Sequence, residues 1–428
     1  MKILGIGSVG PEVELLQLAL RRVGFALATD GVFGEGTRGA LMAFQREQGL
    51  TPDGVAGAST QRALLPWYTG FLIHRIRAGD TLFRLAVEYG GAVGAIETAN
   101  PGIDYRNLQV GQSLVIPLGF PVVPTEIGYS GALISYIVRG LFARYPFLRV
   151  GVIGRSVLGQ PVWALNFGAG ENRVLYNASH HANEWITTPV LLKFLEELAE
   201  AYAAGGSVYG VPAAELFARS NITFVPVVNP DGIDLVTGVI NSGPAFEMAR
   251  RIAQNYPGIP FPSGWKANIR GIDLNLQYPA GWEQAREIKF AQGFVSPAPR
   301  DYVGAAPLSA PESRAMYNFT LAVLPRLTLS YHTQGKVIYW QFLNYDPPGA
   351  RAIGERFSKV SGYALEETPY ASSFAGYKDW YIQNFNRPGY TIEAGLGENP
   401  LPISQFPQIY RDNIGILILG AQLTSGAE

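Results

Sequence analysis

The sequence predicts an α/β protein with a mixed sheet flanked by helices, preceded by two smaller modules. Strand-like and helix-like segments alternate from about residue 126 onward, as they do where helices cover a sheet. Residues 1–66 contain an internal repeat, and stretches rich in proline and glycine at 66–70 and 119–125 are typical of linkers. The domains are therefore expected at 1–67, 71–118 and 126–428.

The amino-acid composition limits the kinds of partner and metal site that this chain can be expected to have. The 428 residues carry a formal net charge of −1, which gives no electrostatic reason to expect binding to nucleic acid or to an anionic membrane. There is no cysteine and there are only four histidines, so a transition metal would need histidine and carboxylate ligands. Hydrophobic residues make up 47%, enough for a packed core. No apolar run reaches the ~20 residues that span a bilayer.

Residues 1–8 indicate the cellular compartment in which the protein is expected. Residues 1–8 are too short and too rich in glycine to form the core of a secretory signal, which needs ~7–15 apolar residues. We therefore expect a cytoplasmic protein, with association with the cell wall or the spore as the alternative, and the residues leave its oligomeric state open.

The first module is predicted from its repeat. Residues 30–34 (DGVFG) return as residues 53–57 (DGVAG), and each copy is followed by a threonine, Thr37 or Thr60, where a helix would begin. The pattern resembles the three-helix peptidoglycan-binding-like domain, and a generic pair of helical hairpins is the alternative.

Residues 71–118 resemble a LysM domain, a small βααβ module that binds glycans. Residues 74–82 predict a short strand and then a helix start, and residues 100–101 and 108–117 match the second half of the family. His74 is expected on the surface of the strand. Two such modules in tandem imply peptidoglycan or its muropeptide fragments as the partner. The resemblance assigns glycan binding to Gly79, Asp80, Thr81, Leu82, Asn100, Pro101 and Ile103.

The larger domain is predicted from short apolar runs and amphipathic stretches. Strands are expected at 150–154, 162–167, 174–178, 222–228, 327–331 and 389–393. Helices are expected at 187–203, 311–324, 347–360, 374–384 and 402–424. Residues 229–232 (NPDG) are chiefly typical of a turn, and Trp185 and Trp380 are expected in the core.

One short motif carries the chemistry. His181 and Glu184 are three residues apart, so that one turn presents an imidazole and a carboxylate to the same point. These are two of the three protein ligands that a catalytic zinc needs. The motif follows a predicted strand and precedes a predicted helix, which is where open α/β sheets place their sites. On its own, this spacing also arises by chance.

Three further segments supply matching residue types. His332 ends one predicted strand and is the candidate third ligand, and Glu393 ends another and is the candidate general base. Residues 266–275 offer a cation, Arg270, and an amide, Asn275. His180 has no place in this set and is expected to pack beside it.

These motifs, in this order, resemble those of the carboxypeptidase A-like zinc peptidases over roughly residues 126–424. Residues 330–335 (SYHTQG) and 375–380 (AGYKDW) are similar to the branch called γ-D-glutamyl-L-diamino acid endopeptidases. Members of that branch carry LysM or peptidoglycan-binding modules in front, as this chain does.

The resemblance implies a role for each residue. One Zn²⁺ would be held by His181, Glu184 and His332. Glu393 would take a proton from the zinc-bound water and pass it to the leaving amine. Arg270 would stabilise the oxyanion.

Other positions carry over as supporting or substrate-binding residues. Asp273 matches the carboxylate that orients the first zinc histidine. Asn275 would bind substrate, and Tyr370 would be the mobile tyrosine of the family. The candidates to read the amino and carboxylate groups of diaminopimelate are Lys378, Asp379 and Arg387.

One departure from the family sets the expected specificity. Exopeptidases have arginine after the asparagine, where this chain has Leu276, and leucine cannot clamp a free terminal carboxylate. We therefore expect cleavage between the γ-carboxyl of D-glutamate and diaminopimelate. The alternatives are an ordinary metallocarboxypeptidase and a non-catalytic wall-binding protein. The preferred diamino acid, and a role in wall recycling, remodelling or sporulation, are left open.

Overall fold

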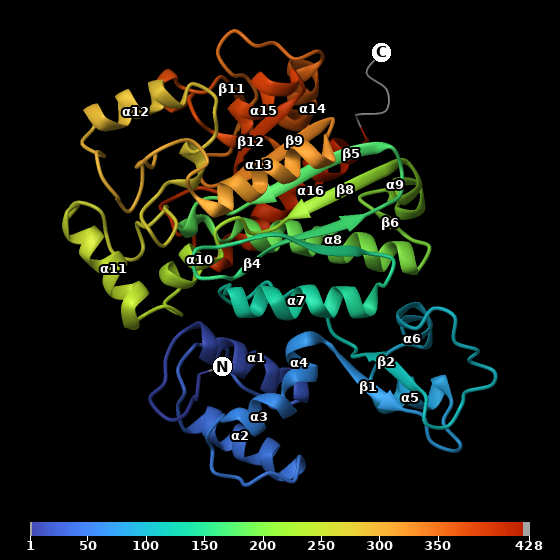
Figure 1. Ribbon diagram of the computed structural model, residues 1–428. Helices are drawn as coiled ribbons and strands as arrows, with labels where there is room; N and C mark the ends of the chain where they lie inside the picture. Colours follow the sequence, from blue (N-terminus) through green and yellow to red (C-terminus); the bar gives the residue numbers. More distant parts are fainter. Residues whose placement is uncertain (1, 423–428) are drawn as a thin grey trace. The chain divides into compact units, whose positions relative to one another are not determined.

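The computed structural model describes residues 2–422 and divides the chain into two compact units, Met1–Arg149 and Val150–Glu428 (Figure 1). The first unit begins with α1 (Pro11–Val23), α2 (Glu35–Glu47), α3 (Ala58–Ala63) and α4 (Leu65–Thr69). The sequence repeat is also a structural repeat. Gln17 of α1 donates to Asp30 at 2.7 Å, and Gln45 of α2 donates to Asp53 at 2.8 Å. A buried glutamine thus holds each glycine-rich turn.

The second part of this unit has the βααβ order expected of residues 71–118. Strands β1 (Phe71–Arg75) and β2 (Ser113–Pro117) pair antiparallel, with α5 (Leu82–Glu88) and α6 (Val93–Ala99) between them in sequence. The expectation for His74 is wrong. Its side chain is buried, with Nε2 2.8 Å from Asp80 Oδ2 and Nδ1 3.2 Å from the Tyr89 hydroxyl. Hydrogen bonds to these two side chains hold the imidazole ring inside the module.

Helix α7 (Gly131–Arg144) was not predicted from the sequence, and it belongs to the first unit. Ser130 caps its first turn by accepting from the Leu133 amide at 3.2 Å. Its last residue, Arg144, is buried and donates to the carbonyls of Gly70 and Leu118, each at 2.6 Å. The segments on either side of the LysM-like module, expected to be linkers, are therefore tied to α7.

We expect Arg144→Ala to lower the free energy of unfolding by about 1.5–3 kcal/mol, because hydrogen bonds from a charged, buried donor are lost. Chemical denaturation of the full chain measures this change. Arg139→Ala is the matched control, since Arg139 is exposed on the same helix and should shift stability by less than ~0.5 kcal/mol. Equal effects of the two substitutions would show that Arg144 does not hold these segments together.

Among the described residues of the second unit, eight strands form a mixed sheet (Figure 1). In spatial order they are β11 (Ala364–Glu366), β10 (Val337–Tyr339), β12 (Gly389–Glu393), β9 (Leu327–His332), β5 (Asn172–Ala178), β8 (Ser220–Val225), β4 (Pro161–Phe167) and β3 (Arg149–Arg155). Strands β8, β5, β9 and β12 run parallel to their neighbours in that set, whereas β4 is antiparallel to β8 and β10 is antiparallel to β12. The predicted mixed sheet is confirmed.

Helices cover both faces of this sheet. Those expected from the sequence are α8 (Thr187–Ala203), α13 (Pro311–Val323), α14 (Ala350–Ser361), α15 (Tyr377–Phe385) and α16 (Phe406–Gln422). Successive strand residues point to opposite faces. Tyr176 of β5 donates its hydroxyl to the Leu417 carbonyl of α16 at 2.9 Å. Its neighbour Leu175 instead packs in an apolar cluster that includes Met316 of α13 and Trp380 of α15.

Several shorter elements were not predicted. They are the sheet strands β10 and β11, then β6 (Ser207–Val208), β7 (Val211–Pro212), α9 (Ala213–Arg219), α10 (Pro230–Val236), α11 (Gly243–Gln254) and α12 (Trp282–Ala291), with single turns η1 (Ala182–Glu184), η2 (Leu274–Leu276), η3 (Tyr370–Ser372) and η4 (Ile403–Gln405). Residues 229–232, expected to be a turn, instead begin α10, because the Asn229 side chain accepts from the Gly232 amide and caps the helix. Strand β8 ends at Val225, three residues earlier than expected. Residues 423 and 424 of the last predicted helix lie outside the described residues.

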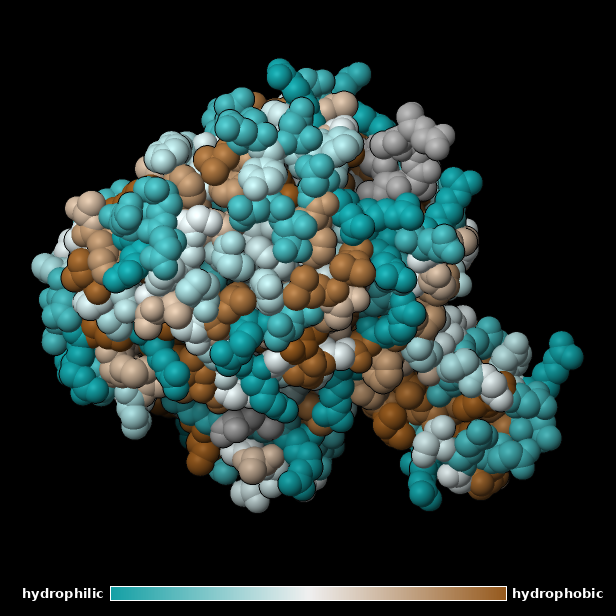
Figure 2. All heavy atoms as spheres, turned by 45° about the horizontal axis from the view of Figure 1, so that its top comes forward, coloured by the Kyte–Doolittle hydropathy of each residue, from teal (hydrophilic) through white to brown (hydrophobic). Residues whose placement is uncertain are grey.

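The surface is mixed in character. Figure 2 shows polar side chains interspersed with small apolar patches on the face in view. Within residues 2–422, none of the helices is both long and apolar enough to span a bilayer.

Candidate active site

Three parallel strands bring the predicted site residues to one edge of the sheet. His181 follows the end of β5, His332 is the last residue of β9, and Glu393 is the last residue of β12. In the register of β9 and β12, His332 and Glu393 are directly paired. The turn η1, which follows β5 after residues 179–181, then returns Glu184 toward His181. The carboxyl ends of neighbouring parallel strands thus supply all four residues.

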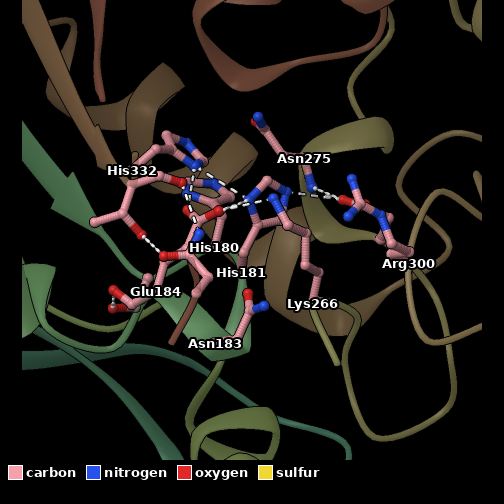
Figure 3. Close-up of polar contacts among 12 residues, drawn as sticks. His180, His181, Asn183, Glu184, Lys266, Asn275, Arg300 and His332 are labelled. Carbon is pink, nitrogen blue, oxygen red and sulfur yellow. Dashed lines mark hydrogen bonds and ion pairs between the residues drawn. The ribbon is translucent and has the colours of Figure 1, made fainter. Parts of the chain in front are cut away.

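His181, Glu184 and His332 point toward one another (Figure 3). The Nδ1 atoms of His181 and His332 are 3.2 Å apart. Glu184 Oε1 lies 3.0 Å from His181 Nδ1, and Glu184 Oε2 lies 2.9 Å from His332 Nδ1. A tetrahedral zinc site with bonds of ~2.0–2.2 Å has ligand atoms about 3.3–3.5 Å apart, close to these separations. The three side chains fit one small divalent cation.

The protonation pattern supports this fit. His181 Nε2 lies 3.2 Å from Asp273 Oδ1 and donates to it, which leaves a lone pair on His181 Nδ1. That lone pair faces carboxylate oxygens and a second imidazole nitrogen. Burial lowers the pKa of His181, but the carboxylates of Glu184 and Asp273 outweigh it and raise the pKa to about 9. Without a metal, a proton therefore occupies Nδ1 at neutral pH, and metal binding must displace it before the lone pair can act as a ligand. The cluster therefore favours a positive charge at its centre.

Lys266 lies beside the same carboxylate. Its Nζ is 2.9 Å from Glu184 Oε1, and its side chain is largely buried (Figure 3). Burial raises the pKa of the Glu184 carboxyl, but His181 and Lys266 outweigh this and hold it well below its usual range. Glu184 is therefore ionised, as a metal ligand must be.

The pKa of the Glu393 carboxyl is raised, whereas that of Glu184 is lowered. Burial raises the pKa of Glu393, His332 acts against this, and the nearby Glu184 carboxylate reinforces it. A carboxyl whose pKa is shifted toward neutrality is suited to accept and return a proton. Its position at the end of β12, directly opposite His332 in the sheet, places it at the metal cluster.

Two cavities open on either side of this centre. One has a volume of about 540 Å³ and is lined by Asn183, Glu184 and the segments 258–264 and 397–399. The other has a volume of about 260 Å³ and is lined by His332, Asn275, Leu276 and parts of 368–379. The residues that line both are His181, Lys266, Arg300, Tyr339 and Glu393. A bond held at this junction would have space for substrate on both sides.

The structure does not bring Arg270 into either cavity. The Asn268 side chain accepts from the amides of Arg270 and Ile272, each at 3.1 Å, and the tight turn leaves Arg270 exposed. The cations that line the centre are instead Lys266 and Arg300. Lys266 begins the segment 266–275, from which only Arg270 and Asn275 were given a role. Sequence reasoning overlooked Arg300 and Tyr339, which carry no motif.

The other substrate-binding candidates differ in their placement. Asn275 lines the smaller cavity, and its Oδ1 accepts from the Tyr377 amide at 3.0 Å. Tyr370 is 65% exposed, contacts Phe374 and lines neither cavity.

Lys378 lines the smaller cavity but is buried and already engaged. Its Nζ has three partners, the Gln341 carbonyl at 2.6 Å, Asp379 Oδ1 at 2.8 Å and Thr368 Oγ1 at 2.9 Å. Two of its three donors are thus used in hydrogen bonds, and its charge is balanced by the adjacent Asp379 carboxylate. Arg387 donates to the carbonyls of Leu324 and Pro325 and lies outside both cavities.

His180 packs beside the cluster, as expected. It is fully buried, its Nε2 lies 3.0 Å from the Tyr278 hydroxyl, and its ring stacks against that of His332 at a centroid distance of 6.0 Å. Burial holds the pKa of His180 well below its usual range, so its ring is neutral.

In the LysM-like module, several of the residues assigned to glycan binding also have structural partners. Asp80 is paired with His74 and accepts from the Arg77 amide at 2.7 Å. Asn100 exchanges hydrogen bonds with the backbone of Val115. Thr81 caps α5.

Comparison with known families agrees with this arrangement. The zinc carboxypeptidase family model matches residues 134–415, a putative peptidoglycan binding domain matches residues 9–64, and a LysM domain matches residues 74–117. The two small modules and the large domain were all expected from the sequence, and their families are confirmed.

Two relatives cover most of the chain. A protein of Lysinibacillus sphaericus named gamma-D-glutamyl-L-diamino acid endopeptidase 1 is 44% identical over 308 residues, which is 72% of this chain and 75% of that protein. An uncharacterized protein of Bacillus subtilis, YqgT, is 39% identical over 293 residues, covering 68% of this chain and 76% of the relative.

Solved structures share the fold at lower identity. Carboxypeptidase A from Helicoverpa armigera has a TM-score of 0.54 at 16% identity, covering 99% of this chain and 96% of that chain. Thrombin activatable fibrinolysis inhibitor has a TM-score of 0.54 at 19% identity, covering 70% and 78%. The chain therefore belongs to the zinc carboxypeptidase family, as a zinc metallopeptidase with a peptidoglycan-binding domain and a LysM domain before its catalytic unit.

Proposed function

We propose that this chain hydrolyses the amide bond between the γ-carboxyl of D-glutamate and the diamino acid of peptidoglycan peptides. The observation that carries the proposal is the pair of cavities meeting at His181 and Glu393, with Leu276 in the wall of the smaller one. An exopeptidase needs a cationic clamp for the terminal carboxylate, whereas this wall offers an apolar side chain at that position. The named relative from Lysinibacillus sphaericus and the two wall-binding domains support the same substrate class.

The catalytic residues act around the scissile carbonyl. His181, Glu184 and His332 would hold Zn²⁺, which would supply Lewis-acid chemistry at the scissile carbonyl. Glu393 accepts a proton from the attacking water and returns it to the leaving amine. Asp273 keeps His181 in the tautomer that presents Nδ1 to the metal.

We assign the stabilisation of the developing oxyanion to Lys266 in place of Arg270. Lys266 lines the junction of the two cavities, next to Glu184, while Arg270 is exposed to solvent. A buried cation acts more strongly on a developing negative charge than an exposed one, because less water screens it. Asn275, in the smaller cavity, retains its Nδ2 group to donate to substrate.

Leu276→Arg tests the specificity. We expect it to lower kcat/KM for L-Ala-γ-D-Glu-meso-diaminopimelate at least ~10-fold, because it places an unmatched cation in the pocket, and to favour peptides with a free α-carboxylate at the cut. Hydrolysis rates on both substrate types measure the change. Leu276→Met, which conserves volume and polarity, should behave like the wild type. Unchanged muropeptide cleavage by Leu276→Arg would remove this position from substrate selection.

The front domains are proposed to hold the enzyme on its substrate. The seven LysM positions from Gly79 to Ile103 that the family resemblance assigns to glycan binding remain candidates for this role. Sedimentation of the full-length protein with insoluble peptidoglycan checks this binding. The cytoplasmic location expected from the first residues stays a prediction.

A further inference from the structure

Arg300 stands out among the cations of the site. It lies in the loop between α12 and α13 and lines both cavities. Its Nε donates to Asp301 Oδ2 at 2.6 Å, and Lys289 Nζ lies 2.7 Å from Asp301 Oδ1. The Asp301 amide in turn donates to Asp273 Oδ2 at 3.1 Å. Arg300 is thus anchored to Asp301, whose backbone amide is in turn bonded to the carboxylate that orients His181.

This anchoring uses only one edge of the guanidinium. Within residues 2–422, no protein acceptor bonds either Nη group of Arg300, and its side chain is 43% exposed. Of the neighbouring cations, Lys266 is paired with Glu184 and is already assigned to the developing oxyanion, and Lys289 is paired with Asp301. Lys378 is paired with Asp379 and donates to Gln341 and Thr368. Arg300 therefore brings unused donors to the junction of the cavities.

The ion-pair cluster that holds Arg300 carries a net positive charge, and the nearby carboxylates of Asp273 and Glu184 are paired with His181 and Lys266. Lys289, Asp301 and Arg300 carry two positive charges and one negative charge. A guanidinium held through Nε can present its Nη groups as a pair, the geometry that matches the two oxygens of a carboxylate. Figure 3 shows Arg300 beside the metal cluster, on the side opposite His332.

We propose that Arg300 is the receptor for a free carboxylate of the substrate, at the junction of the two cavities. This inference rests on the proposed function. A γ-linked glutamyl residue keeps its α-carboxylate free next to the cut, whereas an ordinary α-linked residue has no carboxylate there. The diamino acid on the other side can carry a second one. Arg300 lines both cavities, so it can meet a carboxylate on either side of the cut.

Three peptides distinguish the two sources. The first has both carboxylates free, the second has the D-glutamyl α-carboxylate converted to an amide, and the third has the diamino acid carboxylate converted to an amide. In the wild type, the amide that replaces the bound carboxylate should lower kcat/KM by about 10- to 100-fold. Arg300→Gln should show the same loss on the free peptide and little further loss on that amide.

Two variants serve as controls. Arg286→Gln should match the wild type, because Arg286 is a partly exposed arginine of α12 that pairs with Glu283 and lines neither cavity. Asp301→Asn should give part of the Arg300→Gln loss on the free peptide and none on the matching amide, since Asp301 only positions the guanidinium. Zinc content and thermal unfolding confirm that each variant is folded.

The outcomes are separable. An equal loss for Arg300→Gln on all three peptides would mean that Arg300 acts on the scissile carbonyl or on the fold, and the carboxylate receptor would be overturned. Wild-type rates that ignore both amide replacements would overturn it as well. If the wild type cuts none of the three γ-linked peptides but cuts α-linked peptides, the proposed function itself fails.

Discussion

Glu393→Gln is expected to lower kcat by about 10²–10⁴-fold, the usual contribution of a general base. The amide cannot accept a proton from water, yet it has nearly the same shape, so the fold and the zinc should be retained. Steady-state kinetics on a muropeptide, with metal analysis of the same preparation, measures both. An unimpaired variant would remove Glu393 from the mechanism.

Glu398→Gln is the matched control for this experiment. Glu398 is an exposed carboxylate that lines the larger cavity. Unlike Glu393, it lies outside the strand that pairs with the one ending in His332. Its substitution should change kcat by less than ~3-fold if proton transfer depends on Glu393 alone. A comparable loss in both variants would indicate a general effect of negative charge in the cavity.

His332→Ala should abolish zinc binding at stoichiometric metal and, with it, hydrolysis. It removes one of the three protein ligands, so the affinity loss should exceed the ~10–100-fold typical when only a supporting partner is lost. Asp273→Asn removes only a supporting partner of His181, so it should show the smaller loss of zinc affinity. Competition with a chelator measures the affinities, and the wild type should bind one zinc per chain at this cluster.

His74→Gln is the control for the metal measurement, since this histidine belongs to the LysM module and pairs with Asp80. It should retain one equivalent of zinc. Full occupancy in His332→Ala would contradict the ligand assignment.

The metal ligands were predictable because their signals are local. His181 and Glu184 share one turn, and His332 and Glu393 end apolar strands, so the order of strands alone brings them together. The parallel register then places their side chains at one edge, which is a general property of such sheets.

The cations of the site were not predictable in the same way. Arg270, the residue singled out from the sequence, is turned outward by the Asn268 side chain, a contact that no periodicity reveals. Lys266 and Arg300 come together because the amides of Lys266 and Ala267 both donate to the Pro299 carbonyl, at 2.8 and 2.9 Å. A pairing between two loops has no sequence pattern.

Helix α7 was overlooked for a related reason. It follows the segment 119–125, whose proline and glycine are typical of a linker, and its role depends on Arg144 reaching the carbonyls of Gly70 and Leu118. Lys378 was a candidate to bind substrate because of its charge, but its ammonium group already donates to Gln341 and Thr368 and is paired with Asp379. Charge is visible in a sequence, whereas the partners of a charge are set by packing.

Mass spectrometry of the products from L-Ala-γ-D-Glu-meso-diaminopimelate tests the central claim most directly. The wild type should release L-Ala-D-Glu and meso-diaminopimelate. Glu393→Gln should leave the peptide intact, and removal of zinc should stop the reaction. Release of C-terminal residues from ordinary L-peptides, with the muropeptide left uncut, would contradict the account and establish the exopeptidase alternative.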